Sequence, residues 1–379
     1  MAVAFALPAP DAGPSAQRLV APLLTVVVPT FNESQNLREL VSRLDAVLQD
    51  VAWELVVVDD NSPDGTAKLA KRLARRDPRI RCLRRVGRRG LSGACIEGML
   101  SSAAPYVAVM DGDLQHDETL LPKMLAELRA DRADMVVGSR FVDGGAASTG
   151  FNATRGFISQ LGRRLAAKVL RTDVKDTMSG FFMLRREIVE DTAPRLCTEG
   201  FKILADILAS TEKTLRVKEL GFEFRKRHAG ESKLDAKVAL DFLGFLVNKL
   251  TRGAVPVSFT GFMLVGCIGV VVHLVILRLG LAAGAEFVVA QTLATFIAMG
   301  VNFAINNMTT YSNARLRGWA WLRGLAMFCA ICSLSAVANI GVASWLFEHQ
   351  QTWAVAGLAG ILMGAAWNYA LSARLIWRR

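Results

Sequence analysis

The sequence YVAVMDGDLQHD, from Tyr106 to Asp117, joins an apolar run to a group of acidic and amide side chains. The run Tyr106–Met110 is predicted to be a buried strand, because short apolar segments that end abruptly in polar residues are typical of parallel sheets. In such sheets the chemistry lies at the carboxyl ends of the strands. If the extended conformation continues beyond the run, Asp111, Asp113 and Gln115 share one face.

Three oxygen-bearing side chains on one face are suited to Mg²⁺ or Mn²⁺ held together with the phosphates of a nucleotide. Gly112 has no side chain, so a ligand can approach the backbone closely there. The same residues also fit a polar turn that caps a helix starting near Glu118. The surrounding sequence favours the interpretation as a metal site.

Composition divides the chain into two parts. It has 379 residues, enough for two domains, with 52% hydrophobic residues and a formal net charge of +11. Apolar residues dominate from Pro256 onward, whereas the first two thirds mix strand-like and helix-like patterns with many charges. No nucleic-acid-binding motif accompanies the positive charge, and Arg residues that border apolar spans fit an anionic membrane surface better. Residues 1–22, rich in Ala and Pro, are predicted to be a disordered tail.

Three strand-like runs precede the opening stretch, and each ends in residues suited to a nucleotide. Leu24–Val28 is followed by PTFNES and a helical pattern. Glu54–Val58 ends in Asp59 and Asp60, whose carboxylates can accept hydrogen bonds from a base or ribose, with a structural turn as the alternative. Ile80–Leu83 precedes GRRGLSGA, where a glycine-containing loop leads into a helix whose N-terminus can bind an anion.

Two elements follow the opening stretch in the same alternating order. A helix is predicted over Glu118–Arg129, and a strand over Asp134–Val137 ends in GSRF. Arg140 at this strand end can meet a phosphate as a planar fork. Strands that alternate with helices so regularly predict an open, doubly wound α/β sheet.

Basic residues recur further along. The helical pattern Thr154–Leu170 has basic residues between apolar ones and fits either a helix resting on anionic lipid or an ordinary packed surface helix. The segment FEFRKRHAGESK contains Arg225, Arg227 and Lys233 among its cations. Fixed cations near a metal site suit a diphosphate, a lipid phosphate or both, whereas a solvated charge run is the alternative.

The last third is predicted to be a membrane domain. Leu234–Leu250 is an amphipathic helix expected to lie along the membrane, and it is followed by four apolar spans long enough to cross a bilayer: 257–279, 287–308, 322–347 and 353–376. Basic residues precede the first span, lie between the second and third, and end the chain, whereas the other two loops carry Glu286 and Glu348 and no Lys or Arg. By the positive-inside rule, both ends of this domain and the α/β part face the cytoplasm. Polar residues within the spans are interpreted as interhelical hydrogen-bonding groups, with a polar path as the alternative.

With these pieces placed, the chain resembles the glycosyltransferase family 2 enzymes that make polyprenyl-phosphate sugars, most closely the dolichol-phosphate mannose synthases. The resemblance covers about Leu24 to Leu234 and rests on these motifs in order: VVPTFNE, VVVDDNSPDGT, GLSGA, MDGDLQHDE, VGSRFV, MSGFFMLRRE, GFKIL and RKRHAGESKL. The apolar third is similar to the small four-helix GtrA-like domain through VGCIGVVVH and NFAINN.

The resemblance implies a GT-A fold, a Rossmann-like doubly wound sheet, followed by amphipathic interface helices and a four-helix transmembrane domain. The expected division is a tail over 1–22, a GT-A domain over 23–233, a juxtamembrane amphipathic helix over 234–255 and a GtrA-like transmembrane domain over 256–379. The Q-x-x-R-W motif of processive polysaccharide synthases, which share this fold, does not occur in the sequence.

The family's site residues carry over position by position. Nucleotide-sugar binding is implied for Pro29, Phe31, Glu33, Val58, Asp60, Asp111, Gly112, Asp113, Gln115, Arg140, Arg225 and Lys233. Lipid-phosphate binding is implied for Arg155, Ser159, Arg227 and Lys233. Catalytic roles are implied for Asp113, Arg140, Arg225 and Lys233, and metal ligation for Asp111, Asp113 and Gln115. Phe31 stands where relatives often have Tyr, so a ring stack on the base is retained without a hydroxyl contact; Gly112 replaces a frequent Ala.

The implied reaction is metal-dependent, inverting transfer of a hexose from a nucleotide sugar to a polyprenyl or dolichyl monophosphate at the cytoplasmic membrane face, with a bacterial inner membrane as the expected location. Mannose from GDP-mannose is the expected donor and glucose from UDP-glucose the alternative. Mg²⁺ or Mn²⁺ is the expected cofactor. Nucleic acid is not an expected partner, and the sequence leaves a homo-oligomer open. A rival of another class is a lipid-linked-sugar flippase in which the α/β part only docks.

Overall fold

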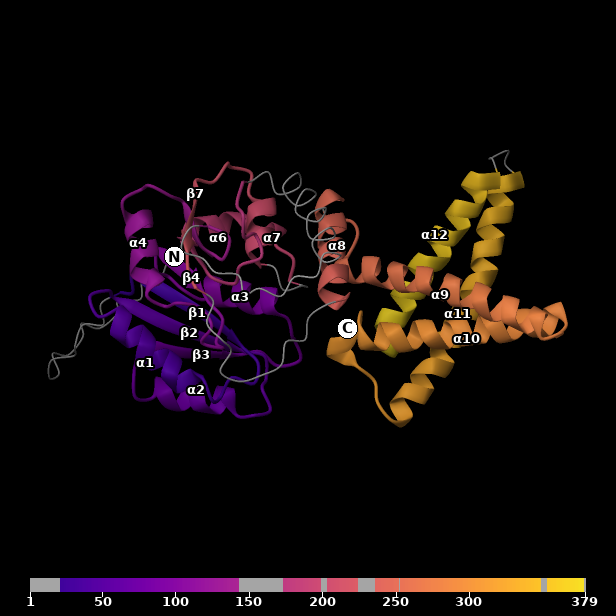
Figure 1. Ribbon diagram of the computed structural model, residues 1–379, viewed down its shortest axis with the longest axis horizontal. Helices are drawn as coiled ribbons and strands as arrows, with labels where there is room; N and C mark the ends of the chain where they lie inside the picture. Colours follow the sequence, from indigo (N-terminus) through magenta and orange to yellow (C-terminus); the bar gives the residue numbers. More distant parts are fainter. Residues whose placement is uncertain are drawn as a thin grey trace, which may run out of the picture.

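The computed structural model describes residues 21–142, 173–198, 203–223, 236–251, 253–348 and 353–377. Its α/β part, coloured indigo to magenta in Figure 1, lies beside a set of long helices coloured orange to yellow. Five of the implied site residues lie outside the described residues, as does most of the 1–22 tail: Arg155, Ser159, Arg225, Arg227 and Lys233.

One seven-stranded sheet organises the α/β part, with strand order β3-β2-β1-β4-β6-β5-β7. The strands are β1 (Leu24–Thr30), β2 (Trp53–Asp59), β3 (Ile80–Arg84), β4 (Tyr106–Val109), β5 (Met135–Ser139), β6 (Phe182–Arg185) and β7 (Val217–Gly221). All neighbouring pairs are parallel except those of β6, which runs antiparallel to both β4 and β5. The predicted doubly wound α/β sheet is confirmed, with one antiparallel strand that the sequence did not indicate.

Helices cover both faces of this sheet (Figure 1). They are α1 (Leu37–Val47), α2 (Thr66–Ala74), α3 (Leu91–Leu100), α4 (Leu120–Arg129), α6 (Arg186–Thr192), continued by the short η1 (Ala193–Arg195), and α7 (Ile203–Ser210). Apolar side chains of α1, α2 and α4 form one layer with the sheet, and those of α3, α6 and α7 form the other. The strands are buried on both faces, so in β1 Val26 and Val28 join the first layer and Val27 the second.

The strand register brings the polar strand ends together. Thr30 at the end of β1 lies opposite Asp59 at the end of β2. β4 ends earlier along the same edge, because Val109 pairs with Val27 and the next residue, Met110, donates its N–H to the Val27 oxygen at 3.1 Å. The segment after β4 therefore crosses the carboxyl end of β1.

The remaining helices are α8 (Ala236–Leu250), α9 (Val257–Ala282), α10 (Phe287–Met308), α11 (Trp319–Glu348) and α12 (Trp353–Leu371), with short turns η2 (Ser312–Ala314) and η3 (Ser372–Ile376). Helices α9 to α12 occupy the four positions predicted for apolar spans. Within the described residues, α9 and α10 are long and apolar enough to cross a membrane. Val271 and Leu274 on α9 and Val288 on α10 are more than half exposed, an apolar surface suited to lipid.

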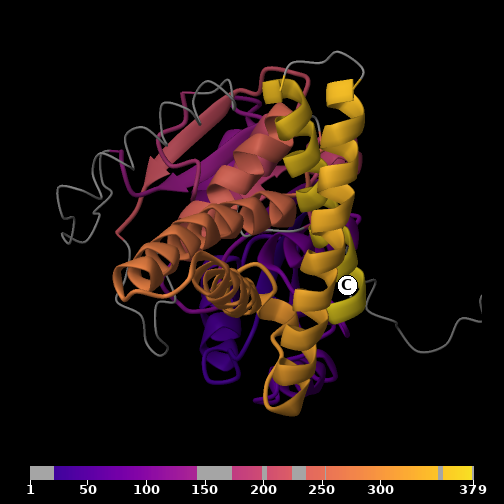
Figure 2. The ribbon, with the colours of Figure 1, turned by 90° about the vertical axis from the view of Figure 1, so that its right-hand side faces the viewer.

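Polar side chains join the membrane-type helices to one another. Asn307, which is 2% exposed, donates from Nδ2 to the Leu316 oxygen at 3.1 Å, and its Oδ1 accepts from the Leu316 N–H at 2.8 Å and from Trp377 Nε1 at 3.1 Å. Helices α11 and α12 run side by side (Figure 2). The Ser335 hydroxyl of α11 donates to the Gly364 oxygen of α12 at 3.0 Å. Asn307 is thus hydrogen-bonded, but to Leu316 in the loop before α11 and to Trp377 after η3, not to another span. The buried Oδ1 atoms of Asn302 and Asn368 have no hydrogen-bond partner among the described residues, so for these two the interhelical interpretation is not borne out.

Helix α8 packs on α7 of the α/β part. Phe245 and Leu246 form an apolar cluster with Ala205, and Lys249 makes an ion pair with the buried Asp206. The Lys249 ammonium also donates to the Ser210 hydroxyl at 2.8 Å and to a backbone oxygen at 2.9 Å. This contact fixes the α/β part to the helix that leads directly into α9.

Candidate active site

The loops after β1 and β2 are joined by a row of hydrogen bonds. Three consecutive backbone N–H groups, those of residues 32–34, donate to the side chains of Ser62, Thr66 and Asp64 at 3.0 Å each. The segments PTFNES and SPDGT therefore act as a pair, because the second supplies acceptors for the backbone of the first. Sequence reasoning missed this pairing, although Ser, Asp and Thr are the side chains that commonly accept such bonds.

Phe31 lies on the first of these loops with 42% of its surface exposed. The Arg89 guanidinium lies 4.8 Å from the centre of its ring. A nucleobase can stack on an exposed ring at a strand end. The planar Arg89 guanidinium can also stack on a base, as it does on the Phe31 ring.

Asp60 is buried and already engaged by protein groups. Its two carboxylate oxygens accept from Arg85 Nη1 at 2.6 Å and from the Gly90 N–H at 2.8 Å. Burial raises the pKa of Asp60 above its ordinary value, while the Gly90 N–H and the Arg85 charge act in the opposite direction. Each carboxylate oxygen has two lone pairs, so a nucleotide group can be added to an acceptor that is already oriented.

Arg85 is the partner that sequence reasoning missed. It is 3% exposed and also contacts Glu97 at 3.2 Å. A Cβ on Gly93 would lie 2.7 Å from its Nη2, and Gly90 has a φ of +144°, which L side chains rarely adopt. These two glycines of GRRGLSGA thus make room for Arg85 and its loop.

The segment after β4 is a turn and does not continue the strand. Leu114 has a φ of +64° and is only 6% exposed, so it packs into the core and reverses the chain. The expected alternation, with Asp111, Asp113 and Gln115 on one strand face, is therefore wrong. The turn instead holds Asp113 at 7% exposure, with its Oδ1 accepting from the Gln115 N–H at 3.2 Å, while the Asp111 side chain is 38% exposed.

His116 lies at the end of this turn and contacts its first residue. Its Nδ1 accepts from the Asp111 N–H at 3.1 Å, and its ring stacks on Phe181 with centroids 5.1 Å apart and meets Phe222 edge-on at 5.7 Å. Burial lowers the pKa of His116 to about 4, so the ring is neutral near pH 7. The sequence analysis assigned no role to this residue.

Arg140 is held by a second acid that sequence reasoning missed. Its Nε and Nη2 donate to the two oxygens of Asp176 at 2.8 and 2.9 Å. The Asp176 side chain is fully buried, and its own N–H donates to Glu219 at 3.1 Å. Hydrogen bonding to Asp176 raises the pKa of Arg140, to which the charge of Asp111 also contributes. Arg140 is thus a permanently charged group with a fixed orientation near the acidic turn.

Gly180, in the motif MSGFF, makes room for the Asp111 carboxylate. A Cβ at this position would lie 2.9 Å from Asp111 Oδ2. The preceding Ser179 is buried and donates from its hydroxyl to the Gly138 oxygen at 2.6 Å, which fixes the segment against β5. Gly112 shows a milder restriction, since its Cβ would lie 3.3 Å from Val28.

The other nucleotide-site candidates lie nearby along the strand ends. Pro29 and Val58 are buried, each one residue before the end of its strand, β1 or β2. The Glu33 carboxylate accepts from the Asn36 amide at 2.7 Å, and the Glu33 Cγ lies 3.6 Å from where a Gly112 Cβ would stand. The structure therefore brings Glu33 next to the acidic turn.

The donor set of the turn fits a hard divalent cation. Two carboxylates and one amide oxygen are the ligands that Mg²⁺ and Mn²⁺ favour. No group of three or more His, Cys, Asp or Glu side chains suited to a metal occurs within the described ranges. Phosphate oxygens of a substrate together with water can complete the coordination of such a cation, as is usual for Mg²⁺.

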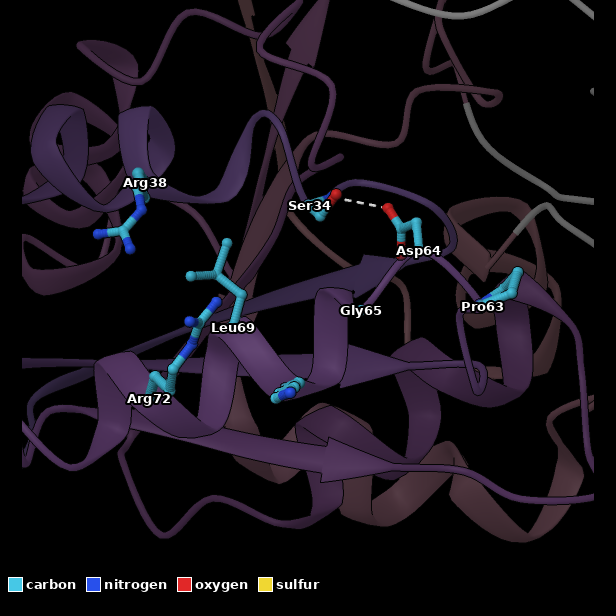
Figure 3. Close-up of a pocket in the computed structure, with 8 residues that line it drawn as sticks. Ser34, Arg38, Pro63, Asp64, Gly65, Leu69 and Arg72 are labelled. Atoms are coloured by element: carbon cyan, nitrogen blue, oxygen red, sulfur yellow. Dashed lines mark hydrogen bonds between the residues drawn. The ribbon is translucent and has the colours of Figure 1, made fainter.

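A separate pocket of about 500 Å³ opens between α1 and α2 (Figure 3). Its lining residues are Ser34, Arg38, Pro63, Asp64, Gly65, Lys68, Leu69 and Arg72. It shares the Ser34–Asp64 hydrogen bond with the joined loops, but Asp111, Asp113 and Arg140 do not line it. We therefore place the candidate active site at the strand ends and not in this pocket.

Comparison with known proteins covers both parts of the chain. The model of glycosyl transferase family 2 matches residues 25–192, and the model of the GtrA/DPMS transmembrane domain matches residues 261–377. A dolichol-phosphate mannosyltransferase of Pyrococcus furiosus is 34% identical over 357 residues, which cover 93% of this chain and 99% of that protein.

Two further relatives match about three fifths of the chain. A dolichol-phosphate mannosyltransferase of Saccharomyces cerevisiae is 34% identical, with 58% of this chain and 84% of that protein covered. An undecaprenyl-phosphate mannosyltransferase of Micrococcus luteus is 30% identical, with coverages of 62% and 95%. Among solved structures, a glucosyl-3-phosphoglycerate synthase of Mycobacterium tuberculosis superposes with a TM-score of 0.44 and 18% identity, over 62% of this chain and 81% of that one.

Proposed function

This chain belongs to the family 2 glycosyltransferases of the dolichol-phosphate mannosyltransferase type, a membrane protein with a GtrA/DPMS domain, and we propose that it transfers mannose from GDP-mannose to a polyprenyl phosphate. The carrying observation is the 34% identity to the Pyrococcus furiosus protein, because the match spans 99% of that protein and so includes both the α/β part and the helices. The polyprenyl-phosphate relative of Micrococcus luteus supports the same acceptor class.

In this proposal the nucleotide lies across the ends of β1 and β2. The base stacks on Phe31, while Asp60, held by Arg85 and Gly90, accepts a hydrogen bond from the base or ribose. The diphosphate lies over the turn after β4, near Asp111 and Asp113. The short loops and their row of hydrogen bonds support this placement, because they hold the site in shape before the donor binds.

A divalent cation held by Asp111, Asp113 and Gln115 would supply positive charge to the departing nucleoside diphosphate. Arg140 adds a permanent charge on the same side, and the fork formed with Asp176 keeps its guanidinium in place. Outside the described residues, Arg225 and Lys233 are proposed to contact the phosphates, and Arg155, Ser159 and Arg227 the lipid phosphate.

The acceptor explains why no general base is needed. A phosphate monoester carries about −1.5 to −2 charges near neutral pH, so its oxygen is already a nucleophile. The protein then has to hold this oxygen against the anomeric carbon of the donor and offset the charge on the leaving group. Single displacement in this geometry inverts the anomeric centre.

The catalytic part is proposed to face the cytoplasm, with α9 to α12 crossing the membrane. The distribution of basic residues among the loops supports this orientation. Attachment of α8 to α7 through Lys249 and Asp206 supports a catalytic part that rests close to the bilayer.

The decisive experiment uses the purified full-length protein in detergent. It is incubated with Mg²⁺ or Mn²⁺, a short polyprenyl phosphate and one nucleotide sugar at a time, and the lipid product is identified by mass. We expect consumption of GDP-mannose. Consumption of UDP-glucose in its place would change the donor, and absence of transfer from every donor would refute the proposed reaction.

A further inference from the structure

The buried imidazole of His116 takes no part in the chemical steps of the proposed reaction. The side chain is 3% exposed, and the residue lies at the end of the turn that carries Asp111 and Asp113. Its Nδ1 accepts a hydrogen bond from the Asp111 N–H at 3.1 Å. This bond joins the first residue of the turn to the last. An acceptor nitrogen carries no proton, so the hydrogen of the neutral ring is on Nε2.

The second nitrogen faces the same residue. His116 Nε2 lies 3.7 Å from Asp111 Oδ2, so one ring contacts both the backbone and the carboxylate side of Asp111. A Cβ on Gly180 would lie 2.9 Å from that same oxygen. The Asp111 carboxylate therefore lies close to both the imidazole and the backbone of the MSGFF segment, which restrict its position.

The ring itself has little freedom. It is nearly parallel to Phe181, with 13° between the planes, and Phe222 meets it edge-on. Phe181 directly precedes β6 and Phe222 directly follows β7, so the ring ties the turn after β4 to the far half of the sheet.

We propose that His116 is a positioning residue that sets the backbone of Asp111, and through it the carboxylate, for a divalent cation. The proposal rests on the proposed function, in which Asp111 is a cation ligand. Groups that orient a metal ligand commonly change metal affinity or activity by about 10–100-fold when they are replaced. Loss of the acceptor would leave the Asp111 N–H without this partner and loosen the turn.

The test compares His116→Leu, His116→Asn and His116→Gln in the full-length protein. Asn places its side-chain oxygen close to the position of Nδ1, whereas Gln reaches toward the position of Nε2 and Leu has no acceptor. His273→Leu is a matched control, since it makes the same change on α9, away from the turn. Binding of Mn²⁺ in the presence of GDP, with UDP in a parallel arm, is followed by electron paramagnetic resonance, and the melting temperature is recorded for each variant.

We expect His116→Leu and His116→Gln to weaken Mn²⁺ binding about tenfold or more. His116→Asn should retain most of the affinity even though its smaller side chain lowers the melting temperature. A purely structural role would lower stability in all three variants and leave the Mn²⁺ affinity of the folded protein unchanged. If His116→Leu does not fold, the difference between Asn and Gln decides in the same way.

Asp111→Asn distinguishes the cation site itself from the positioning role of His116. Weaker Mn²⁺ binding in Asp111→Asn together with unchanged binding in His116→Leu would overturn the positioning role and leave the cation site standing. Equal losses for Asn and Leu at position 116 would overturn it as well. Unchanged binding in Asp111→Asn would remove the cation assignment and, with it, the role of His116.

Discussion

Gly180→Ala is a small change that separates activity from stability at this site. The added methyl group would lie 2.9 Å from Asp111 Oδ2 and 3.2 Å from Oδ1. Ordinary van der Waals contact begins at about 3.5 Å, so the carboxylate must move by about 0.6 Å (3.5 minus 2.9). The backbone itself accepts alanine, because the φ of Gly180 lies outside the left-handed range.

The expected loss follows from that displacement. A misplacement of about 1 Å in a positioned group can cost about 100-fold in rate, so about 0.6 Å predicts roughly a tenfold fall in kcat/KM. A tenfold fall corresponds to about 1.4 kcal/mol of transition-state stabilisation. Stability should change much less than the rate, because the gain of about 0.4–1 kcal/mol that a Gly→Ala change gives through the unfolded chain offsets the cost of moving the partly exposed carboxylate.

The assay measures initial rates of mannosyl transfer from GDP-mannose to a short polyprenyl phosphate over a range of Mn²⁺ concentrations, with the melting temperature measured in parallel. Gly266→Ala on α9 is the matched control, because its added methyl group would meet no atom within 4 Å. We expect a lower rate and a higher Mn²⁺ requirement for Gly180→Ala alone. Wild-type kcat/KM and wild-type Mn²⁺ dependence in this variant would refute the confinement of Asp111.

Three further predictions concern charged groups. Asp113→Ala should abolish transfer in the assay above, and full turnover would defeat its assignment to the cation. Asp176→Asn should lower kcat/KM about tenfold by removing the charge that orients Arg140, a result contradicted by unchanged kinetics. Lys249→Met should lower the melting temperature markedly, because removing one partner of a buried pair costs about 3–5 kcal/mol. Adding Asp206→Asn to Lys249→Met should restore part of the loss, and a further drop would contradict the pairing.

Several features could be predicted because they depend on local sequence. Apolar runs that stop at polar residues located β1, β2 and β4 to within a residue or two. Helical periodicity and the uninterrupted apolar character of the last third located α9 and α10. The same pattern indicated the edge of the sheet at which the acidic residues meet, because parallel strands end on one side.

Other features depend on contacts between distant segments. The antiparallel direction of β6 depends on pairing with both β4 and β5, for which its four residues carry no local signal. The reversal at Leu114 occurs because the core accepts that side chain, so tertiary packing outweighed the tendency of the strand to continue. Asp111 and Asp113 consequently lie on a turn and not on a strand face.

The sequence by itself determined which side chains stand at the strand ends. It also determined that apolar helices long enough to cross a membrane follow the α/β part. Both are properties of short stretches of chain. Only the tertiary structure decided which groups hold those side chains. Arg85 reaches Asp60 across 25 residues and Asp176 reaches Arg140 across 36. A buried charge needs a partner, and that partner can come from any part of the chain that folding brings within hydrogen-bonding distance.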